Sequence, residues 1–144
     1  MKRIFLTMFI MCVSVAAQTP FTRGVNLTQW FQASDARSIQ FSPFIKQDFI
    51  NIQTLGCDVI RLPINLHAMT NGAPDYVLDP LLLGFLDQAV DWAEELHLHL
   101  ILDNHSFDPI ANTDPQIGKI LIPVWKQMAA HYKDRSGYLY YEVL

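Results

Sequence analysis

The sequence predicts an α/β protein built on a parallel β-sheet, and three observations point to that fold class. After residue 20, short runs rich in β-branched and aromatic residues alternate with segments whose apolar residues recur at helical spacing. Two helical segments open with a capping residue followed by proline, Ser42-Pro43 and Asp79-Pro80. Hydrophobic residues make up 51 % of the 144 positions, which is enough for a packed core and excludes intrinsic disorder.

The first three elements are expected between residues 22 and 64. Residues 22–27 form a short strand candidate, and a helix follows from Ser42-Pro43 to Leu55, where Gly56 ends it. Residues 57–64 then form an apolar, β-rich run. The apolar stripe of the helix is formed by Phe44, Ile45, Phe49, Ile52 and Leu55.

The alternation of helix and strand continues in the second half of the chain. A helix opens at Asp79-Pro80, a strand is expected over 97–102, and residues 106–118 have the composition of a loop. A third helix is expected with Pro123 in its first turn and its end at about Lys133, and a fourth strand is expected over 138–144. The stripe of the second helix consists of Leu82, Leu83, Leu86, Val90, Ala93 and Leu96. Strands alternating with helices in this order predict βαβ units and a parallel sheet.

The N-terminus has the pattern of a secretory signal peptide. Lys2 and Arg3 precede an apolar run from Ile4 to Val15, and Ala17 supplies a small residue before the expected cleavage point. Cleavage there leaves 8 basic and 14 acidic residues, a net charge of −6. We therefore expect a secreted protein, extracellular or periplasmic, that is not held in a membrane.

Charge and cysteine content exclude further classes. No Lys/Arg cluster of the kind that binds nucleic acid is present, and the net charge of the whole sequence is −4. Cys12 lies in the expected signal peptide, which leaves Cys57 without a partner for an intrachain disulfide. Cys57 opens an apolar strand, so we interpret it as a buried structural thiol rather than a nucleophile.

Polar side chains follow each of the first three strands. Ligands of parallel α/β proteins bind beyond the carboxyl ends of the strands, so these side chains form the candidate site. They are Asn26, Gln29 and Trp30 after the first strand, Arg61, Asn65 and His67 at the second, and Asp103, Asn104 and His105 at the third.

Five of these positions also have a structural explanation. Arg61 lies in an apolar strand, and its structural alternative is one half of a buried ion pair. The structural alternative for His105 is a hydrogen-bonded core histidine. Asn26 could satisfy loop backbone, and Trp30 could belong to the core rather than stack on a sugar ring. Asp103 lies at the boundary between strand and rim, where it could have either a structural role or a role in the site.

At this point four segments resemble glycoside hydrolase family 5, the cellulase family. They are RGVNLTQWF (23–31), GCDVIRLPIN (56–65), LILDNH (100–105), and VWKQMAAHYKD followed by YYEVL within 124–144. The resemblance covers essentially the whole chain after the expected signal peptide. It implies an eight-stranded (β/α) barrel, of which this chain supplies the N-terminal half with four strands and three helices. It also implies a retaining hydrolase that acts on a β-linked polysaccharide or oligosaccharide without a cofactor.

The resemblance assigns roles to individual residues. Arg61 is similar to the arginine that keeps the nucleophilic carboxylate of the family ionised, and His105 to a histidine that contacts the sugar beside the scissile bond. Asn26 and Trp30 match at the level of substrate-lining residues. His67 and Asn104 are further substrate-binding candidates because they flank the same rim; His67 lies after the second strand and Asn104 next to His105.

Both catalytic glutamates of the family pattern lie outside this sequence. The acid/base glutamate follows an asparagine in an Asn-Glu-Pro motif, and the sequence ends at Leu144, where that motif would continue. We interpret Glu142 as structural because it lies inside the last strand, and Glu94 and Glu95 as solvated helix charges. The sequence is therefore expected to be part of a longer enzyme, and to be inactive alone.

Three functional hypotheses follow. The first is the N-terminal half of an endo-β-1,4-glucanase, with mannan, xyloglucan or β-1,3-glucan as alternative substrates. The second is a metal-dependent hydrolase on the same kind of barrel, using Asp103, His105 and His67. His97 and His99 are not expected to bind metal, because they open their strand at the opposite end. The third is a non-catalytic carbohydrate-binding module, although such modules are usually β-sandwiches and helical periodicity argues against one.

Overall fold

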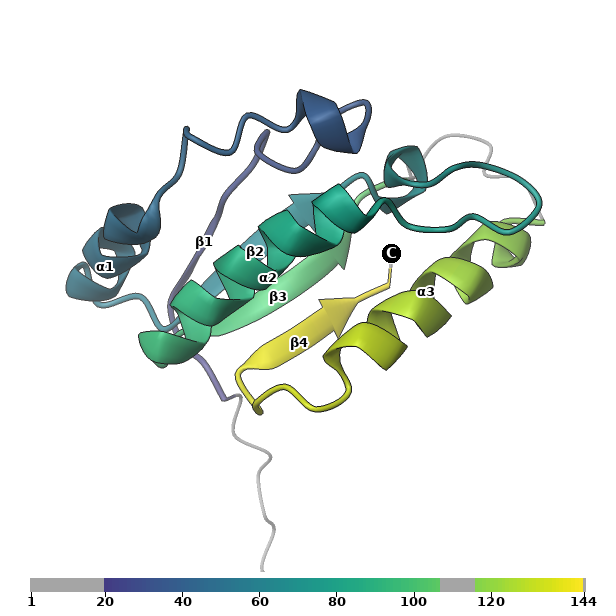
Figure 1. Ribbon diagram of the computed structural model, residues 1–144. Helices are drawn as coiled ribbons and strands as arrows, with labels where there is room; N and C mark the ends of the chain where they lie inside the picture. Colours follow the sequence, from purple (N-terminus) through teal and green to yellow (C-terminus); the bar gives the residue numbers. More distant parts are fainter. Residues whose placement is uncertain (1–19, 107–115, 144) are drawn as a thin grey trace, which may run out of the picture.

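The computed structural model describes residues 20–106 and 116–143, and shows a four-stranded parallel sheet with three α-helices (Figure 1). The expected signal peptide, part of the expected loop and Leu144 lie outside the described residues. The strands are β1 (Gly24–Asn26), β2 (Val59–Ile64), β3 (His99–Asn104) and β4 (Leu139–Glu142). The helices are α1 (Lys46–Thr54), α2 (Pro80–Glu95) and α3 (Gly118–Tyr132), with 3-10 turns η1 (Ala36–Ser38) and η2 (Leu66–Met69).

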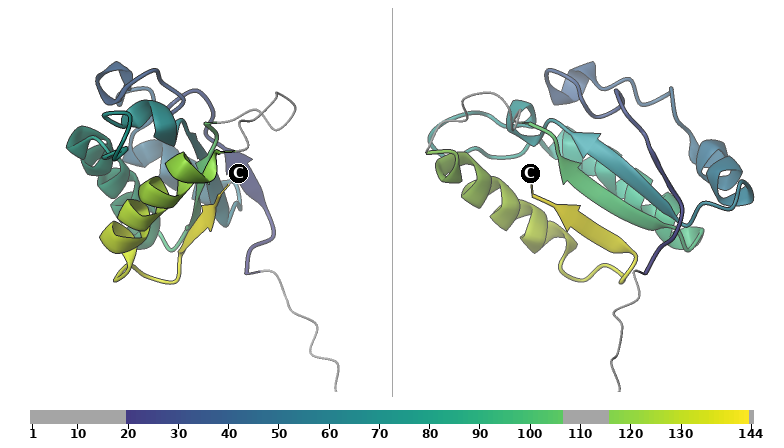
Figure 2. Two further views of the ribbon diagram at one scale, coloured as in Figure 1. Left: turned by 90° about the vertical axis from the view of Figure 1, so that its right-hand side faces the viewer. Right: turned by 180° about the vertical axis from the view of Figure 1, so that it is seen from behind.

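The strands follow one another in chain order, β1-β2-β3-β4, and all neighbours are parallel. All three α-helices lie on one face of the sheet, so that a view from behind shows the strands in front of the helices (Figure 2). A doubly wound sheet would reverse its strand order and carry helices on both faces. Unreversed order with helices on one face is the arrangement of a (β/α) barrel, and this chain forms the N-terminal half of one.

The core lies between the sheet and the helices. In β2, alternate residues Ile60, Leu62 and Ile64 are fully buried and belong to the same cluster as helix residues such as Leu82 and Leu86. This period-two burial puts Arg61 of the same strand on the opposite face, which becomes the inner face of a barrel. The strand register pairs Asn26 with Arg61 on this inner face.

Two helices begin where the sequence did not place their start. The helix expected from Ser42-Pro43 begins at Lys46, because Asp48 accepts a hydrogen bond from the Ile45 backbone N–H at 2.8 Å and so caps the first turn. The third helix, expected to have Pro123 in its first turn, begins at Gly118, so that Pro123 lies inside α3. In contrast, Asp79 caps α2 as expected, with its side chain accepting from the Leu81 N–H.

Strand β3 lies two residues further along the chain than expected. It runs from His99 to Asn104 rather than over 97–102. His97 has φ of 53°, a left-handed conformation that belongs to the turn after α2 and cannot continue a strand. The shift matters for function because it brings Asp103 into the strand, where the pleat turns its side chain to the inner face.

Candidate functional site

Arg61 is the centre of a charged cluster on the inner face of the sheet. Its Nε and Nη2 donate to the two carboxylate oxygens of Glu142 at 2.7 and 2.9 Å, a bidentate pair. Nη2 also forms an ion pair with Oδ2 of Asp103 at 2.8 Å, and Nη1 donates to Oδ1 of Asn26 at 3.4 Å. The guanidinium of Arg61 therefore joins side chains from all four strands. The ion pair expected as the structural alternative for Arg61 is present.

Asp103 is the most buried charge of this cluster, with a side chain only 1 % exposed. Its Oδ2 contacts Nδ1 of His105 at 3.2 Å as well as the guanidinium of Arg61. Burial raises the pKa of Asp103 above its ordinary value, Arg61 opposes the rise, and the negative charge of Glu142 adds to it. One carboxylate oxygen thus links Arg61 to His105.

Glu142 is part of this cluster, which sequence reasoning missed. The sequence predicts a structural role for Glu142 inside the last strand. The structure places Glu142 at the end of β4, in direct contact with Arg61. The hydrogen bond from Arg61 lowers the pKa of Glu142, so the residue is held as a carboxylate. The register pairs Glu142 with Asp103, so the two carboxylates lie on the same face of the sheet.

Asn104 supports the rim from beneath rather than lining it. It is 2 % exposed; its Nδ2 donates to the Val143 carbonyl at 3.2 Å, and its Oδ1 accepts from the Ser106 hydroxyl at 2.6 Å. The Ser106 hydroxyl in turn accepts from the His67 backbone N–H at 2.9 Å. This chain of bonds ties the loop after β2 to the end of β3.

A pocket lies at the rim beside His105, whose side chain is 51 % exposed. It is lined by Asn65, His67, Ala68, His105 and Ser106. Three of the candidate site residues, Asn65, His67 and His105, therefore line one pocket at the rim. Its lining combines ring nitrogens, a hydroxyl and an amide, which are groups that hydrogen-bond to sugar hydroxyls.

Trp30 is placed in the core instead of at the rim. Its side chain is 2 % exposed, and its ring packs against Phe31 and Phe44 with centroids 4.7 and 5.1 Å apart. A ring without an accessible face cannot stack on a sugar, so the structure favours the core alternative over the substrate-lining one. The aromatic cluster around Trp30 consists of Phe31, Phe41, Phe44 and Phe49.

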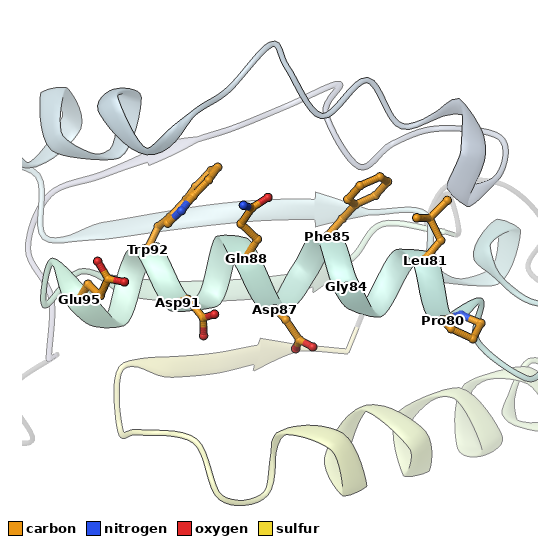
Figure 3. A pocket seen from close by; sticks show the side chains of 9 residues that line it. All are labelled: Pro80, Leu81, Gly84, Phe85, Asp87, Gln88, Asp91, Trp92 and Glu95. Atoms are coloured by element: carbon orange, nitrogen blue, oxygen red, sulfur yellow. The ribbon is translucent and has the colours of Figure 1, made fainter.

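A second concave region lies on the outer side of the helix layer, along α2 (Figure 3). Phe85 and Trp92 point to one side of the helix and Asp87 and Asp91 to the other. Its carboxylates are occupied by other side chains: Asp87 contacts His131, and Asp91 contacts Arg135. No residue predicted from the sequence to bind substrate lines this region.

Within residues 20–106 and 116–143, no three His, Cys, Asp or Glu side chains gather in a group that could hold a metal ion. Asp103, His105 and His67, the trio of the metal-hydrolase hypothesis, do not form such a group. The parallel sheet with helices on one face also contradicts the β-sandwich expected of a carbohydrate-binding module.

Comparison with known proteins identifies the family. The family model described as Cellulase (glycosyl hydrolase family 5) matches residues 16–144. The chain belongs to glycosyl hydrolase family 5. Endoglucanase 3 of Fibrobacter succinogenes is 27 % identical over 136 residues, covering 85 % of this chain and 20 % of that protein.

Solved structures agree with the half-barrel fold. An endoglucanase structure superimposes with a TM-score of 0.74 at 26 % identity, covering 85 % of this chain and 40 % of that one. A hyperthermophilic endo-β-1,4-glucanase in complex with substrate gives a TM-score of 0.75 at 25 % identity, covering 85 % and 39 %. The chain thus spans less than half the length of each of these family 5 proteins.

Proposed function

We propose that the full-length protein, meaning the product of the reading frame that holds this chain, is an endo-β-1,4-glucanase. The observation that carries the proposal is the family 5 match over residues 16–144, joined to a charged cluster at the carboxyl ends of the strands. In a (β/α) barrel this end holds the active site. The pocket beside His105, with its hydroxyl, amide and ring-nitrogen groups, supports a polyhydroxylated substrate.

In this proposal Arg61 supplies positive charge for carboxylates that must stay ionised. Its effect is visible on Glu142, whose pKa it lowers. A retaining glycosidase needs one ionised carboxylate as nucleophile, and a guanidinium nearby favours that form. His105, Asn26 and His67 would bind sugar hydroxyls, and Asn104 would hold the rim in place through Ser106.

The two carboxylates of the Arg61 cluster, Asp103 and Glu142, do not supply the catalytic pair in this proposal. Asp103 is 1 % exposed and cannot reach a sugar, and Glu142 is held ionised by a bidentate contact with Arg61, which disfavours the protonated form a general acid needs. Retaining chemistry requires two accessible carboxyls about 5–5.5 Å apart. We therefore propose that residues 1–144 alone do not hydrolyse glycosidic bonds.

The test compares the full-length protein with the 144-residue chain on carboxymethyl cellulose, mannan, xyloglucan and β-1,3-glucan. We expect reducing ends from the first substrate with the full-length protein, and none above a blank with the chain. Proton NMR of the first product should show retention of the anomeric configuration. Activity on mannan or β-1,3-glucan alone would overturn the substrate class, and hydrolysis by the chain would overturn the assignment of its carboxylates.

Secretion through residues 1–17 forms part of the proposal and rests on the sequence pattern. No helix within the described ranges is both long and apolar enough to span a bilayer. N-terminal sequencing of the protein exported by a bacterial host should begin at Gln18. Retention of Met1 on protein in the cytosol would contradict it.

A further inference from the structure

We propose that Asp103 is a positioning residue that keeps the proton of His105 on Nδ1, so that Nε2 accepts a hydrogen bond from a substrate hydroxyl. The proposal rests on the function proposed above and deepens it, because it names the atom and the direction of one hydrogen bond to the sugar. Oδ2 of Asp103 contacts both Arg61 and His105.

The geometry of this contact leaves one arrangement of the imidazole proton. Oδ2 of Asp103 lies 3.2 Å from Nδ1 of His105, and a carboxylate can only accept. In a neutral imidazole the nitrogen that faces the carboxylate carries the proton, and the other nitrogen is left as an acceptor. The side chain of His105 is 51 % exposed while that of Asp103 is 1 % exposed, so the free nitrogen belongs to the open side of the rim.

The charge on Asp103 depends on the groups packed around it. Arg61 of β2 lies 2.8 Å away and favours the carboxylate, whereas burial and Glu142 of β4 disfavour it. Arg61 thus favours the ionised form of a buried carboxylate whose Oδ2 also lies against Nδ1 of His105.

The same sheet offers a matched control for the removal of one carboxylate charge. Asp58 lies just before β2 at the opposite end, and its carboxylate accepts from the Thr22 N–H, the Thr22 hydroxyl and the Arg23 N–H. Asp58→Asn and Asp103→Asn therefore make the same chemical change at the two ends of the sheet. A merely structural role for Asp103 predicts similar outcomes from the two variants.

The first experiment measures kcat and KM of the full-length protein on a soluble β-1,4-glucan. Asp103→Asn should lower kcat/KM by about ten- to hundredfold per folded molecule, the range seen when a partner that orients a histidine is removed. Asp58→Asn should leave kcat/KM within about twofold. Equal kcat/KM of folded Asp103→Asn and wild type would overturn the proposal.

The second experiment reads the proton position directly. In ¹⁵N-labelled full-length protein, long-range ¹H–¹⁵N spectra should show His105 with its proton on Nδ1, moving to Nε2 in Asp103→Asn. A wild-type proton on Nε2, as a protonated Asp103 would produce, overturns the proposal. This readout needs no activity, so an inactive wild type would refute the glucanase while leaving the tautomer measurable.

A third pair of variants covers the case in which Asp103→Asn does not fold. His105→Gln places its amide near the position of Nε2, whereas His105→Asn places it near Nδ1. Because His105 is half exposed, both variants should fold. We expect His105→Gln to keep more activity than His105→Asn by severalfold, and the reverse order would overturn the assignment of Nε2.

Discussion

The two ends of the sheet use carboxylates in opposite ways. At the amino end, Asp58 accepts three hydrogen bonds of 2.7 to 2.9 Å from Thr22 and Arg23, which close the chain before β1 against the start of β2. At the carboxyl end, the buried carboxylate of Asp103 contacts the guanidinium of Arg61 at 2.8 Å and the imidazole of His105 at 3.2 Å. The carboxylate of Asp58 is thus held by hydrogen bonds from nearby backbone and hydroxyl groups. The carboxylate of Asp103 instead contacts two side chains of the candidate site, Arg61 and His105.

The pKa values follow the same division. The hydrogen bond from the Arg23 backbone N–H, with further bonds from Thr22, lowers the pKa of Asp58. Burial raises the pKa of Asp103. Buried carboxylates with raised pKa values gather at functional sites, whereas a carboxylate satisfied by backbone N–H groups is typical of a structural role. The amino end of the sheet, with Asp58, thus has a stabilising role. The carboxyl end, with Asp103, has the properties of a functional site.

The largest expected effect comes from Arg61→Ala at the chemical end. Removing the guanidinium leaves Asp103 buried without its cation and Glu142 without its partner. We expect kcat of the full-length protein to fall by about 10²–10³, as when one preorganised electrostatic group is lost. Because Arg61 is 30 % exposed and water screens the loss, the stability cost should be lower than for a buried pair, about 1–3 kcal/mol.

The measurement is kcat per folded molecule, with the free energy of unfolding from urea titration as its companion. A variant that is less stable but has normal kcat per folded molecule would show that Arg61 has only a structural role. The two ends of the sheet would then not differ in function.

Trp30→Phe tests a residue near the rim that the structure assigns to the core. Trp30 is 2 % exposed, so a smaller ring should cost about 1–3 kcal/mol through the cavity it leaves, reduced because the indole N–H has no partner among the described residues. KM for a soluble glucan should not change. A severalfold rise of KM at unchanged stability would show that Trp30 contacts substrate.

The fold was predictable because the signals that specify it are local. The capping pair Asp79-Pro80 predicted the start of α2 to the residue, and alternating strands and helices predicted the parallel sheet. Boundaries that depend on other contacts were displaced. The Asp48 cap decides where α1 begins, and the left-handed turn at His97 decides where β3 begins.

The candidate site was predictable in its position and only partly in its members. Arg61 and His105 were found because polar residues at strand ends are visible in a sequence. Glu142 was missed because its partner lies 81 positions earlier in the chain, and only the register of three strands brings the two together. Trp30 follows β1 in the sequence, yet its depth depends on Phe rings from segments further along the chain.

Arg135→Ala removes another guanidinium with carboxylate partners, this time on the helix layer. Arg135 follows α3 and contacts Asp91 and Glu94 of α2 at 2.6 and 3.1 Å. These pairs lie near solvent, so we expect a loss of about 1 kcal/mol that becomes smaller at high salt. As the matched control for Arg61→Ala it should leave kcat unchanged, and a lower kcat would show that α2 and α3 influence the rim.

The smallest effect, and the sharpest comparison, lies in the pH dependence of stability for Asp58→Asn and Asp103→Asn. The folded pKa of Asp58 is lowered, so its contribution is present above its unfolded pKa of about 3.9 and is lost as pH falls through the folded pKa. The folded pKa of Asp103 is raised, so ionising it opposes folding as pH rises through that range.

Thermal unfolding of both variants and wild type between about pH 3 and pH 7 should therefore give differences of opposite slope. Wild type gains stability over Asp58→Asn as pH rises, because only wild type keeps the ionised acceptor of the Arg23 N–H. Wild type loses stability relative to Asp103→Asn over the same rise, because it must ionise a buried group. Slopes of the same sign would mean that Arg61 compensates Asp103 as fully as backbone N–H groups compensate Asp58, and that the two ends of the sheet are electrostatically alike.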